Sequence, residues 1–399
     1  MSAAREPIFD TTKRTHPVPK RHGESLFSFF NRVAGSYWEH ARQLVQTWAD
    51  HLDDPHDYRA VRGYLRSGRD DQFRSAFLEL YLHECLRKAG YTVTVHPNLP
   101  GTNRHPDFYA ERAGEGFYLE AIAPSSSAAE LAAANRRGAM FDIVNQLQDP
   151  HFLLWLSHLE QGSAAPAAGK LRKELKRWLA GLDPDDYHDA NNLPEWSWSS
   201  DGWSVTFRAI PKDIERRGIR PGDRIIGVHG ETIITRGDDT ATLHAALAEK
   251  DHAYPNLNAP FIIAVGVDIL GSPRWDVSNA LYGHVAVSFR RDTTGVLVFD
   301  REIRQPDGYF GTPPSWRNHQ VSGLLVINNV MPYHFIDADA TLWRHPAPAK
   351  ALHTDLGLPW ATTELDETQL RDRPAPISAA ELLGFVDPWP PGDPWLAET

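Results

Sequence analysis

The chain has 399 residues, of which 41% are hydrophobic and 23% charged, and its formal net charge is −11. This composition is that of a folded globular protein, and the length suits about two or three domains or one enlarged α/β domain. The negative charge argues against a protein that coats nucleic acid, although it leaves room for a local basic groove. Cys85 is the only cysteine, which excludes an internal disulfide framework and fits a reducing compartment.

Neither a membrane anchor nor a secretory signal is predicted. No run reaches the roughly 18 apolar residues that a membrane span needs. The best apolar run, residues 261–267, predicts a buried strand, and residues 1–23 lack the apolar segment of a secretory signal. We therefore expect a cytoplasmic protein without a membrane partner.

Residues 1–69 are expected to form a flexible arm followed by short helices. The helical part, residues 24–52, ends at an acidic turn that contains proline. Five residues near this turn are of metal-binding types: His51, Asp53, Asp54, His56 and Asp57. Because they crowd around a proline turn, a solvated loop is favoured over a metal site.

Residues 70–162 are predicted to form a compact α/β core. Residues 71–89 have the pattern of a helix, which Gly90 ends. The elements that follow are expected in this order: strands at 91–97, 106–112 and 117–123 with a turn at 113–116, a helix at 128–148 and a fourth strand at 151–157. Helix, three strands, helix and strand together make a mixed α/β unit.

The helix over residues 71–89 is apolar nearly all round and should be buried, yet it carries Glu79. At about 100° per residue, Gln72, Ser75 and His83 share the face of Glu79. A polar stripe on a buried helix indicates a site or a water pocket.

Two further carboxylates are placed to share a metal ion. Asp107 stands at the start of the second strand, and Glu120 lies thirteen residues later in the third. If the turn falls within residues 113–116, the two carboxylates face each other across the antiparallel pair and repel unless a cation joins them. Oxygen ligands favour Mg²⁺ first and Mn²⁺ second, and such an ion could polarise a phosphodiester.

This stretch resembles the PD-(D/E)XK superfamily of nucleases, which has the restriction-endonuclease-like fold. The superfamily pattern is an acidic residue on the first core helix, Pro-Asp on a strand and Glu-X-Lys on the next strand. It is matched over roughly residues 70–160 by Glu79, Pro106-Asp107 and Glu120-Ala121-Ile122. The chain also looks like a group of bacterial proteins that carry this motif without an established function. By resemblance, Asp107, Glu120 and the carbonyl of Ala121 would hold the metal, and Glu79 would assist.

The departure from the pattern is at Ile122. It stands where the superfamily has a lysine, and it can neither orient a water nor neutralise charge on the phosphate. A basic group from another element could replace it, and the candidates are His83, Arg104, Arg136 and Arg137. The helix after Glu120 also carries polar side chains that could touch the substrate or the metal shell: Asn135, Asp142 and Gln146.

Residues 170–399 are expected to form a further α/β region with a Pro- and Trp-rich tail. Their first helix has a basic stripe that could contact phosphates or simply face solvent: Lys170, Lys173, Lys176 and Arg177. Residues 216–233 resemble the core of a PDZ domain, and residues 240–250 could be the helix that follows. The glycine-rich carboxylate loop of a PDZ domain is missing.

The expected fold is α/β: a restriction-endonuclease-like mixed sheet flanked by helices, with an N-terminal helical segment and an additional α/β C-terminal region. The first functional hypothesis is a Mg²⁺-dependent nuclease for nucleic acid, DNA before RNA, in bacterial defence or DNA processing. It could act as a homodimer or with a defence-system partner. The second is an inactive nuclease-like protein that binds nucleic acid or a protein, and the third is a PDZ-like peptide-binding scaffold.

Overall fold

The computed structural model describes residues 5–15, 17–123, 128–187, 192–219, 225–229, 247, 253–254, 257–267, 273–291, 297–312, 315–367 and 369–395. The chain divides into two compact units, each assembled from separate stretches. Unit 1 comprises Met1–Thr12, Ser36–Pro124 and Asp238–Asp393, and unit 2 comprises Lys13–Gly35, Ser125–Gly237 and Pro394–Thr399. The fold is mixed α/β, as the sequence predicts.

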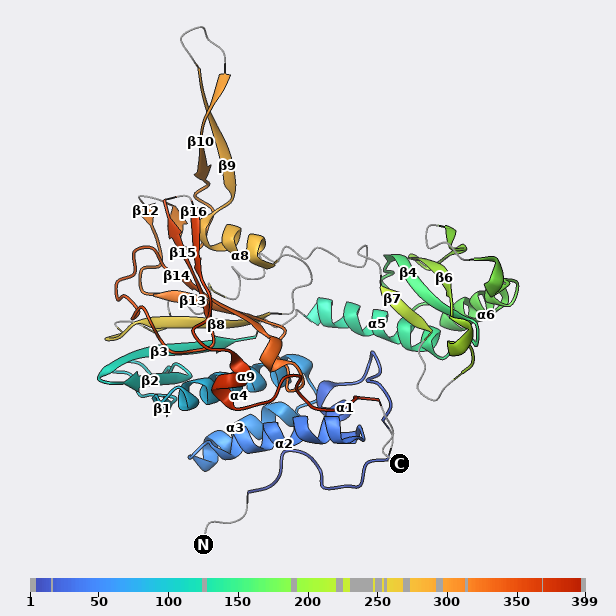
Figure 1. Ribbon diagram of the computed structural model, residues 1–399, viewed down its shortest axis with the longest axis horizontal. Coiled ribbons are helices and arrows are strands. Elements are labelled where there is room, and N and C mark those ends of the chain that lie inside the picture. Colours follow the sequence, from blue (N-terminus) through green and yellow to red (C-terminus); the bar gives the residue numbers. More distant parts are fainter. Residues whose placement is uncertain are drawn as a thin grey trace. The chain divides into compact units, whose positions relative to one another are not determined.

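Unit 1 is built on an eight-stranded mixed sheet (Figure 1). Its strands, in spatial order, are β1 (Thr92–Val95), β2 (Phe108–Arg112), β3 (Glu115–Ile122), β8 (Phe261–Val267), β13 (Gly323–Asn328), β14 (Asp339–Arg344), β15 (Ala361–Asp366) and β16 (Gln369–Arg373). The helices of the unit are α2 (Ser36–Asp50), α3 (Pro55–Arg66), α4 (Asp70–Lys88), α8 (Pro273–Tyr282) and α9 (Ala379–Leu383).

Two small two-stranded sheets complete unit 1. They are formed by β9 (Val285–Arg291) with β10 (Leu297–Arg304), and by β11 (Gly311–Thr312) with β12 (Ser315–Trp316). The β9–β10 ribbon extends away from the main sheet (Figure 1).

A tight turn sets the register of the β2–β3 hairpin. Arg112 pairs with Glu115, so only Ala113 and Gly114 form the loop. Both have positive φ angles, 54° and 83°, as a type I′ turn requires. The turn therefore falls within the predicted residues 113–116.

The strand next to β3 comes from a distant part of the chain. The expected fourth strand forms as β4 (Phe152–Glu160), but β4 pairs with β6 (Trp203–Pro211) and β7 (Ile226–His229) in a separate sheet. The parallel neighbour of β3 is β8, with Glu120 opposite Ile263 and Ile122 opposite Val265. The sequence order of strands is a poor guide here because the chain leaves unit 1 after β3 and returns about a hundred residues later.

Helix α4 covers one face of this sheet, with α2 and α3 packed against it (Figure 1). It begins and ends within one residue of the predicted helix, and Gly90 has a φ of +83°. A Cβ on Gly266 of β8 would lie 3.1 Å from Leu78 Cδ2, so the absence of a side chain at Gly266 allows α4 to approach closely.

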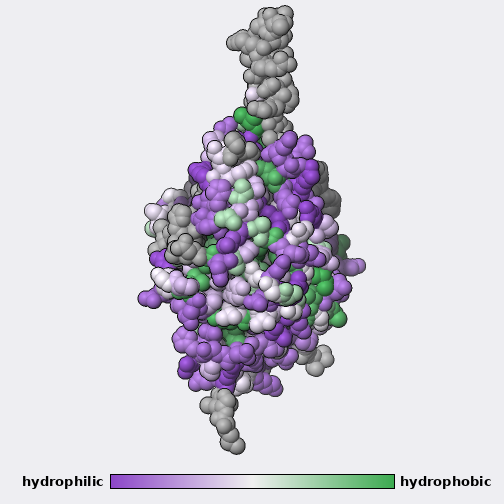
Figure 2. All heavy atoms as spheres, turned by 90° about the vertical axis from the view of Figure 1, so that its left-hand side faces the viewer, coloured by the Kyte–Doolittle hydropathy of each residue, from purple (hydrophilic) through white to green (hydrophobic). Residues whose placement is uncertain are grey.

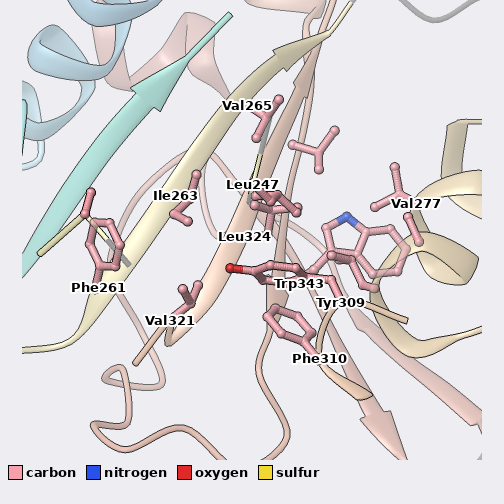
Figure 3. Packing of buried hydrophobic residues seen from close by; sticks show 14 of the residues in the cluster. Leu247, Phe261, Ile263, Val265, Val277, Tyr309, Phe310, Val321, Leu324 and Trp343 are labelled. Atoms are coloured by element: carbon pink, nitrogen blue, oxygen red, sulfur yellow. The ribbon is translucent and has the colours of Figure 1, made fainter. Parts of the chain in front are cut away.

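The other face of the sheet is buried in a separate hydrophobic cluster. Phe261, Ile263 and Val265 of β8 lie on the same side of the strand and pack with residues of β13 and β14 such as Leu324 and Trp343 (Figure 3). All five residues from Phe261 to Val265 are at most 1% exposed. The predicted buried strand at 261–267 is therefore confirmed, and it is buried on both faces as parallel strands usually are.

Unit 2 combines a four-stranded sheet with helices. The sheet has the order β5 (Glu195–Ser200), β6, β4, β7, and the helices are α1 (Leu26–Arg32), α5 (Ala128–Asn145) and α6 (Ala168–Leu179). Leucines of α6 and apolar residues of α5, β4 and β6 form its core. The Pro221-Gly222-Asp223 turn of the PDZ-like stretch lies outside the described residues, as does all of 240–250 except Leu247.

The surface shown in Figure 2 is mostly hydrophilic, with hydrophobic residues in small separate groups. Large apolar side chains that are exposed elsewhere are scattered along the chain, as in many monomeric proteins: Val18, Tyr64, Ile214, Ile219, Val386 and Trp395. Among the described helices, none has both the length and the apolar character needed to cross a membrane.

A buried carboxylate of α4, Glu84, is held in its ionised form. Its side chain is 1% exposed, and Oε1 lies 2.7 Å from Nδ1 of His51 and 2.9 Å from Nε of Arg87. Burial alone would raise the pKa of Glu84, but His83, Arg87 and His51 outweigh burial and lower the pKa to about 2.

Replacement of Glu84 by Gln should lower the free energy of unfolding at pH 7 by about 2 kcal/mol, because the Arg87 guanidinium and the His51 ring lose an ionised partner. The ordinary pKa of 4.5 exceeds the folded pKa, so the stabilisation is complete above about pH 4.5 and is lost as the pH falls through about 2. Urea denaturation at pH 7 and pH 2.5 measures both effects. Equal stability of the two proteins at pH 7 would contradict this account.

Candidate functional site

The hairpin register places the two predicted metal-binding carboxylates opposite each other. Phe108 pairs with Leu119, so Asp107, one residue before β2, stands across from Glu120. The Oδ2 atom of Asp107 accepts a 2.7 Å hydrogen bond from the backbone N–H of Ala121. This bond holds the Asp107 carboxylate against the strand that carries Glu120.

Glu120 is the more buried of the two carboxylates. It is 2% exposed, whereas the side chain of Asp107 is 18% exposed. Side chains alternate along a strand, so Glu120 shares its face with Tyr118 and Ile122, which belong to or pack against the cluster in Figure 3. The site is therefore closed toward the core at Glu120 and open toward solvent at Asp107.

Tyr254 contacts Glu120, and sequence reasoning missed it. Its hydroxyl lies 2.7 Å from Oε2 of Glu120 and 2.9 Å from the backbone oxygen of His105. Burial, the Glu120 carboxylate and the Asp107 carboxylate raise the pKa of Tyr254 well above its ordinary value. The phenol therefore keeps its single proton, which it can give to only one of the two oxygens at a time.

Two contacts locate Glu79 along the sheet. The His83 ring is 6.0 Å from the Phe108 ring, and Leu78 meets Gly266 near the end of β8. Because α4 runs antiparallel to β3 and β8, Glu79 lies one helical turn before His83, toward the end of the sheet where β2 begins and β3 ends. The Ser75 hydroxyl is 3.4 Å from the Glu79 carboxylate, and both are half-buried.

His83 lies on the face of the sheet opposite Glu120. Phe108 and Leu119 form a cross-strand pair, and the next residue along β3, Glu120, points the other way. His83 is 5% exposed, and its Nδ1 atom has no hydrogen-bond partner among the described residues and lies 3.8 Å from Glu84. The strands therefore separate this candidate base from the carboxylate of Glu120.

Arg104 is exposed on the loop before Asp107. Its positive charge opposes the rise in the pKa of Tyr254, which places the guanidinium within electrostatic reach of the site. Ile122, at the position of the superfamily lysine, is half-buried and packs against the hydrophobic cluster of unit 1. No basic group can come from that position.

A second histidine, His96, lies close to Asp107, and sequence reasoning missed it. Its Nε2 atom is 3.9 Å from Oδ1 of Asp107, and its backbone N–H donates to the Asp107 carbonyl at 2.9 Å. Its Nδ1 atom is 3.4 Å from Oδ1 of Asp57. The φ of His96 is +46°, an uncommon conformation for a residue with a side chain.

The prediction of a solvated loop around residues 51–57 is therefore wrong in part. Asp54 caps α3 by accepting from the backbone N–H of His56 at 2.7 Å, and Pro55 is the first residue of the helix. His51 binds Glu84, and Asp57 faces His96. These contacts join residues distant in the sequence, so the local pattern could not reveal them.

The predicted nucleic-acid contacts belong to unit 2. Arg136 and Arg137 are half-buried on α5, and Nε of Arg136 is buried with no hydrogen-bond partner in the part of the chain that the structure describes. Gln146 accepts a 2.9 Å hydrogen bond from Arg172, and the side chain of Asn135 lies outside the described residues. Asp142 accepts from the backbone N–H groups of His22 and Gly23 at 2.8 and 3.0 Å, and Lys170, Lys173 and Arg177 are exposed on α6.

The donor set at Asp107 and Glu120 fits a divalent cation in chemistry but is small. In the part of the chain that the structure describes, no three His, Cys, Asp or Glu side chains are grouped to hold a metal ion. Asp107 and Glu120 supply two side chains, and the carbonyl of Ala121 adds a backbone oxygen. Oxygen ligands suit Mg²⁺ or Mn²⁺. A carboxylate can accept several bonds, so the contacts to Ala121 and Tyr254 are compatible with an added cation.

Comparison with known proteins found no matching family model, no similar curated protein and no matching solved structure. The function is therefore argued from the site itself.

Replacement of Tyr254 by Phe removes the hydroxyl and keeps the ring. We expect the free energy of unfolding to fall by about 1–3 kcal/mol, because buried Glu120 loses a donor. Urea denaturation of Tyr254→Phe, Glu120→Gln and the double variant should give a coupling energy of about 0.5–3 kcal/mol. Tyr91→Phe, which removes a buried hydroxyl bonded to the Leu356 carbonyl, is the control and should be additive with Glu120→Gln. Additivity in the Tyr254 pair would contradict the assignment.

Proposed function

We propose that the protein is a metal-dependent nuclease that hydrolyses phosphodiester bonds of nucleic acid, DNA before RNA, on a restriction-endonuclease-like core. The observation that carries the proposal is the placement of Asp107 opposite Glu120, with the Asp107 carboxylate bound to the Ala121 N–H. A purely structural hairpin has no need for two facing carboxylates, because like charges in close positions destabilise a strand pair.

The order of elements supports the same proposal. Helix α4 is followed by the antiparallel strands β1, β2 and β3, and β8 then runs parallel to β3. The helix of Glu79, the strand that follows Asp107 and the strand of Glu120 stand in the chain in the order of the superfamily pattern. Glu79 lies toward the same end of the sheet as the two strand carboxylates.

The residues of the proposed site would have different roles. Asp107 and Glu120 would hold the cation, and a bound Mg²⁺ or Mn²⁺ would supply Lewis-acid polarisation of the phosphate and activation of an attacking water. The Tyr254 hydroxyl and the surrounding apolar residues fix the orientation of Glu120. Arg104 adds positive charge where the phosphate would approach, and His96 positions Asp107 from the side of Asp57.

An inactive nuclease-like protein that binds nucleic acid or a protein is the second candidate. The observation that favours it is the packing of Ile122 against the core, which leaves no base at the position of the superfamily lysine. A role in defence or DNA processing, and a homodimer or a defence-system partner, stay predictions.

Asp107→Ala and Glu120→Gln should each lower metal-dependent cleavage by about 100-fold or more, because each removes a ligand of the cation. Supercoiled plasmid and single-stranded RNA, each with Mg²⁺ or Mn²⁺, serve as substrates. Glu115→Gln removes a carboxylate from an exposed position of the same strand and should leave the rate unchanged. Failure of the folded wild-type protein to cut either substrate would favour the inactive alternative.

His96→Ala should lower kcat about tenfold with little change in KM, because Asp107 loses a neighbour that orients it. His96→Gln keeps a hydrogen-bonding group and should restore part of the rate. His353→Ala, at an exposed histidine of the same unit, is the control. A rate that is unaffected in His96→Ala would exclude this positioning role.

A further inference from the structure

Helix α6 of unit 2 presents a dense row of cations to solvent. Five basic residues lie within eight positions and all are exposed: Lys170, Arg172, Lys173, Lys176 and Arg177. The opposite face is anchored in the core of the unit, where Leu171 and Leu175 are 0% exposed and Leu179 is 3% exposed. The basic face is therefore held outward by packing.

These cations form no ion pairs within the described residues, although Glu174 lies on the same helix. In the part of the chain that the structure describes, no carboxylate forms an ion pair with any of the five, and Arg172 bonds to the neutral Gln146. Other arginines of unit 2 do have acidic partners: Arg32 binds Glu24, Arg208 binds Glu195 and Arg217 binds Asp185. In a chain with a net charge of −11, an uncompensated row of positive charge is an unusual local feature.

Helix stability does not explain the whole row. Lys176 and Arg177 lie in the last turn, where a cation interacts favourably with the helix dipole. Lys170, by contrast, lies in the first turn, which has no acidic residue and where a cation is unfavourable. Its charge therefore costs the helix stability and calls for another role.

The spacing of the row suits a duplex backbone. Lys170, Lys173 and Arg177 follow one another at i, i+3 and i+7, so they form one ridge opposite the buried leucines. At about 1.5 Å per residue the ridge is roughly 10 Å long, a length of B-DNA axis that carries about six phosphate charges. The three cations of the ridge, with Arg172 and Lys176 on its flank, would offset part of that charge.

A membrane surface is a poorer match for the same helix. An interfacial helix binds by inserting a free apolar face between lipids. The apolar face of α6 is already buried in unit 2, which leaves only the charged face for an external partner.

We propose that the exposed face of α6 binds the phosphate backbone of double-stranded DNA, so that unit 2 supplies a surface for the nucleic acid. This inference rests on the proposed nuclease function and adds the surface that captures the nucleic acid. Backbone contacts of this kind carry no sequence information, so the binding is independent of sequence and sensitive to salt.

The test is fluorescence anisotropy with a labelled 20-base-pair duplex, using full-length Asp107→Ala protein so that no cleavage occurs. Addition of K170E, K173E and R177E should weaken binding at least tenfold at 100 mM salt. It should also reduce the slope of log affinity against log salt by about three, because each lost phosphate contact removes close to one unit. An acidic residue favours the helix at position 170 and disfavours it at position 177, so circular dichroism must show that the variant is folded.

The matched control is R59E, K88E and K350E, which makes the same change in net charge at exposed cations of unit 1. This control should bind the duplex with the affinity of its parent. The parent should bind DNA in preference to vesicles rich in phosphatidylserine. The proposal would be overturned by equal losses of duplex affinity in the two triple variants, by a preference of the parent for the vesicles, or by an absence of duplex binding by the parent. Duplex binding that needs α6, without cleavage by the wild type, would uphold this surface and refute the nuclease.

Discussion

The register of the β2–β3 hairpin is the constraint on which the proposed site of unit 1 depends. The two-residue loop at Ala113 and Gly114 fixes the pairing, and the pairing puts Asp107 across from Glu120. A shift by one residue would turn Glu120 to the opposite face of the sheet, against α4, and leave the two carboxylates apart. The bond from the Ala121 N–H to the Asp107 carboxylate links the two segments one residue before β2 begins.

Burial of Glu120 imposes the next constraint. A carboxylate that is 2% exposed needs partners, since an isolated buried charge is very costly. Tyr254 supplies one, and a cation shared with Asp107 would supply another. The neighbouring cluster around β8 keeps water from Glu120, which strengthens the interaction with any such cation. The same cluster receives Ile122, so the packing that closes the site also occupies the place of the superfamily lysine.

The local parts of this arrangement could be predicted and the distant parts could not. Periodicity and turn chemistry indicate α4, β1, β2, β3 and the facing carboxylates, because these features depend on residues close in the sequence. The partner strand β8, the Tyr254 contact and the approach of His96 to Asp57 depend on contacts between distant segments, for which a single sequence carries no direct signal. The exposed basic row on α6 was visible as a pattern, but its lack of acidic partners required the structure.

Titration of Mn²⁺ into the folded wild-type protein, followed by electron paramagnetic resonance, tests the central claim most directly. A site made by Asp107 and Glu120 predicts that the wild type binds Mn²⁺, that Mg²⁺ competes for the site, and that Asp107→Ala abolishes the binding while Glu115→Gln retains it. Absence of binding by the wild type at millimolar Mn²⁺, or undiminished binding by Asp107→Ala, would contradict the account.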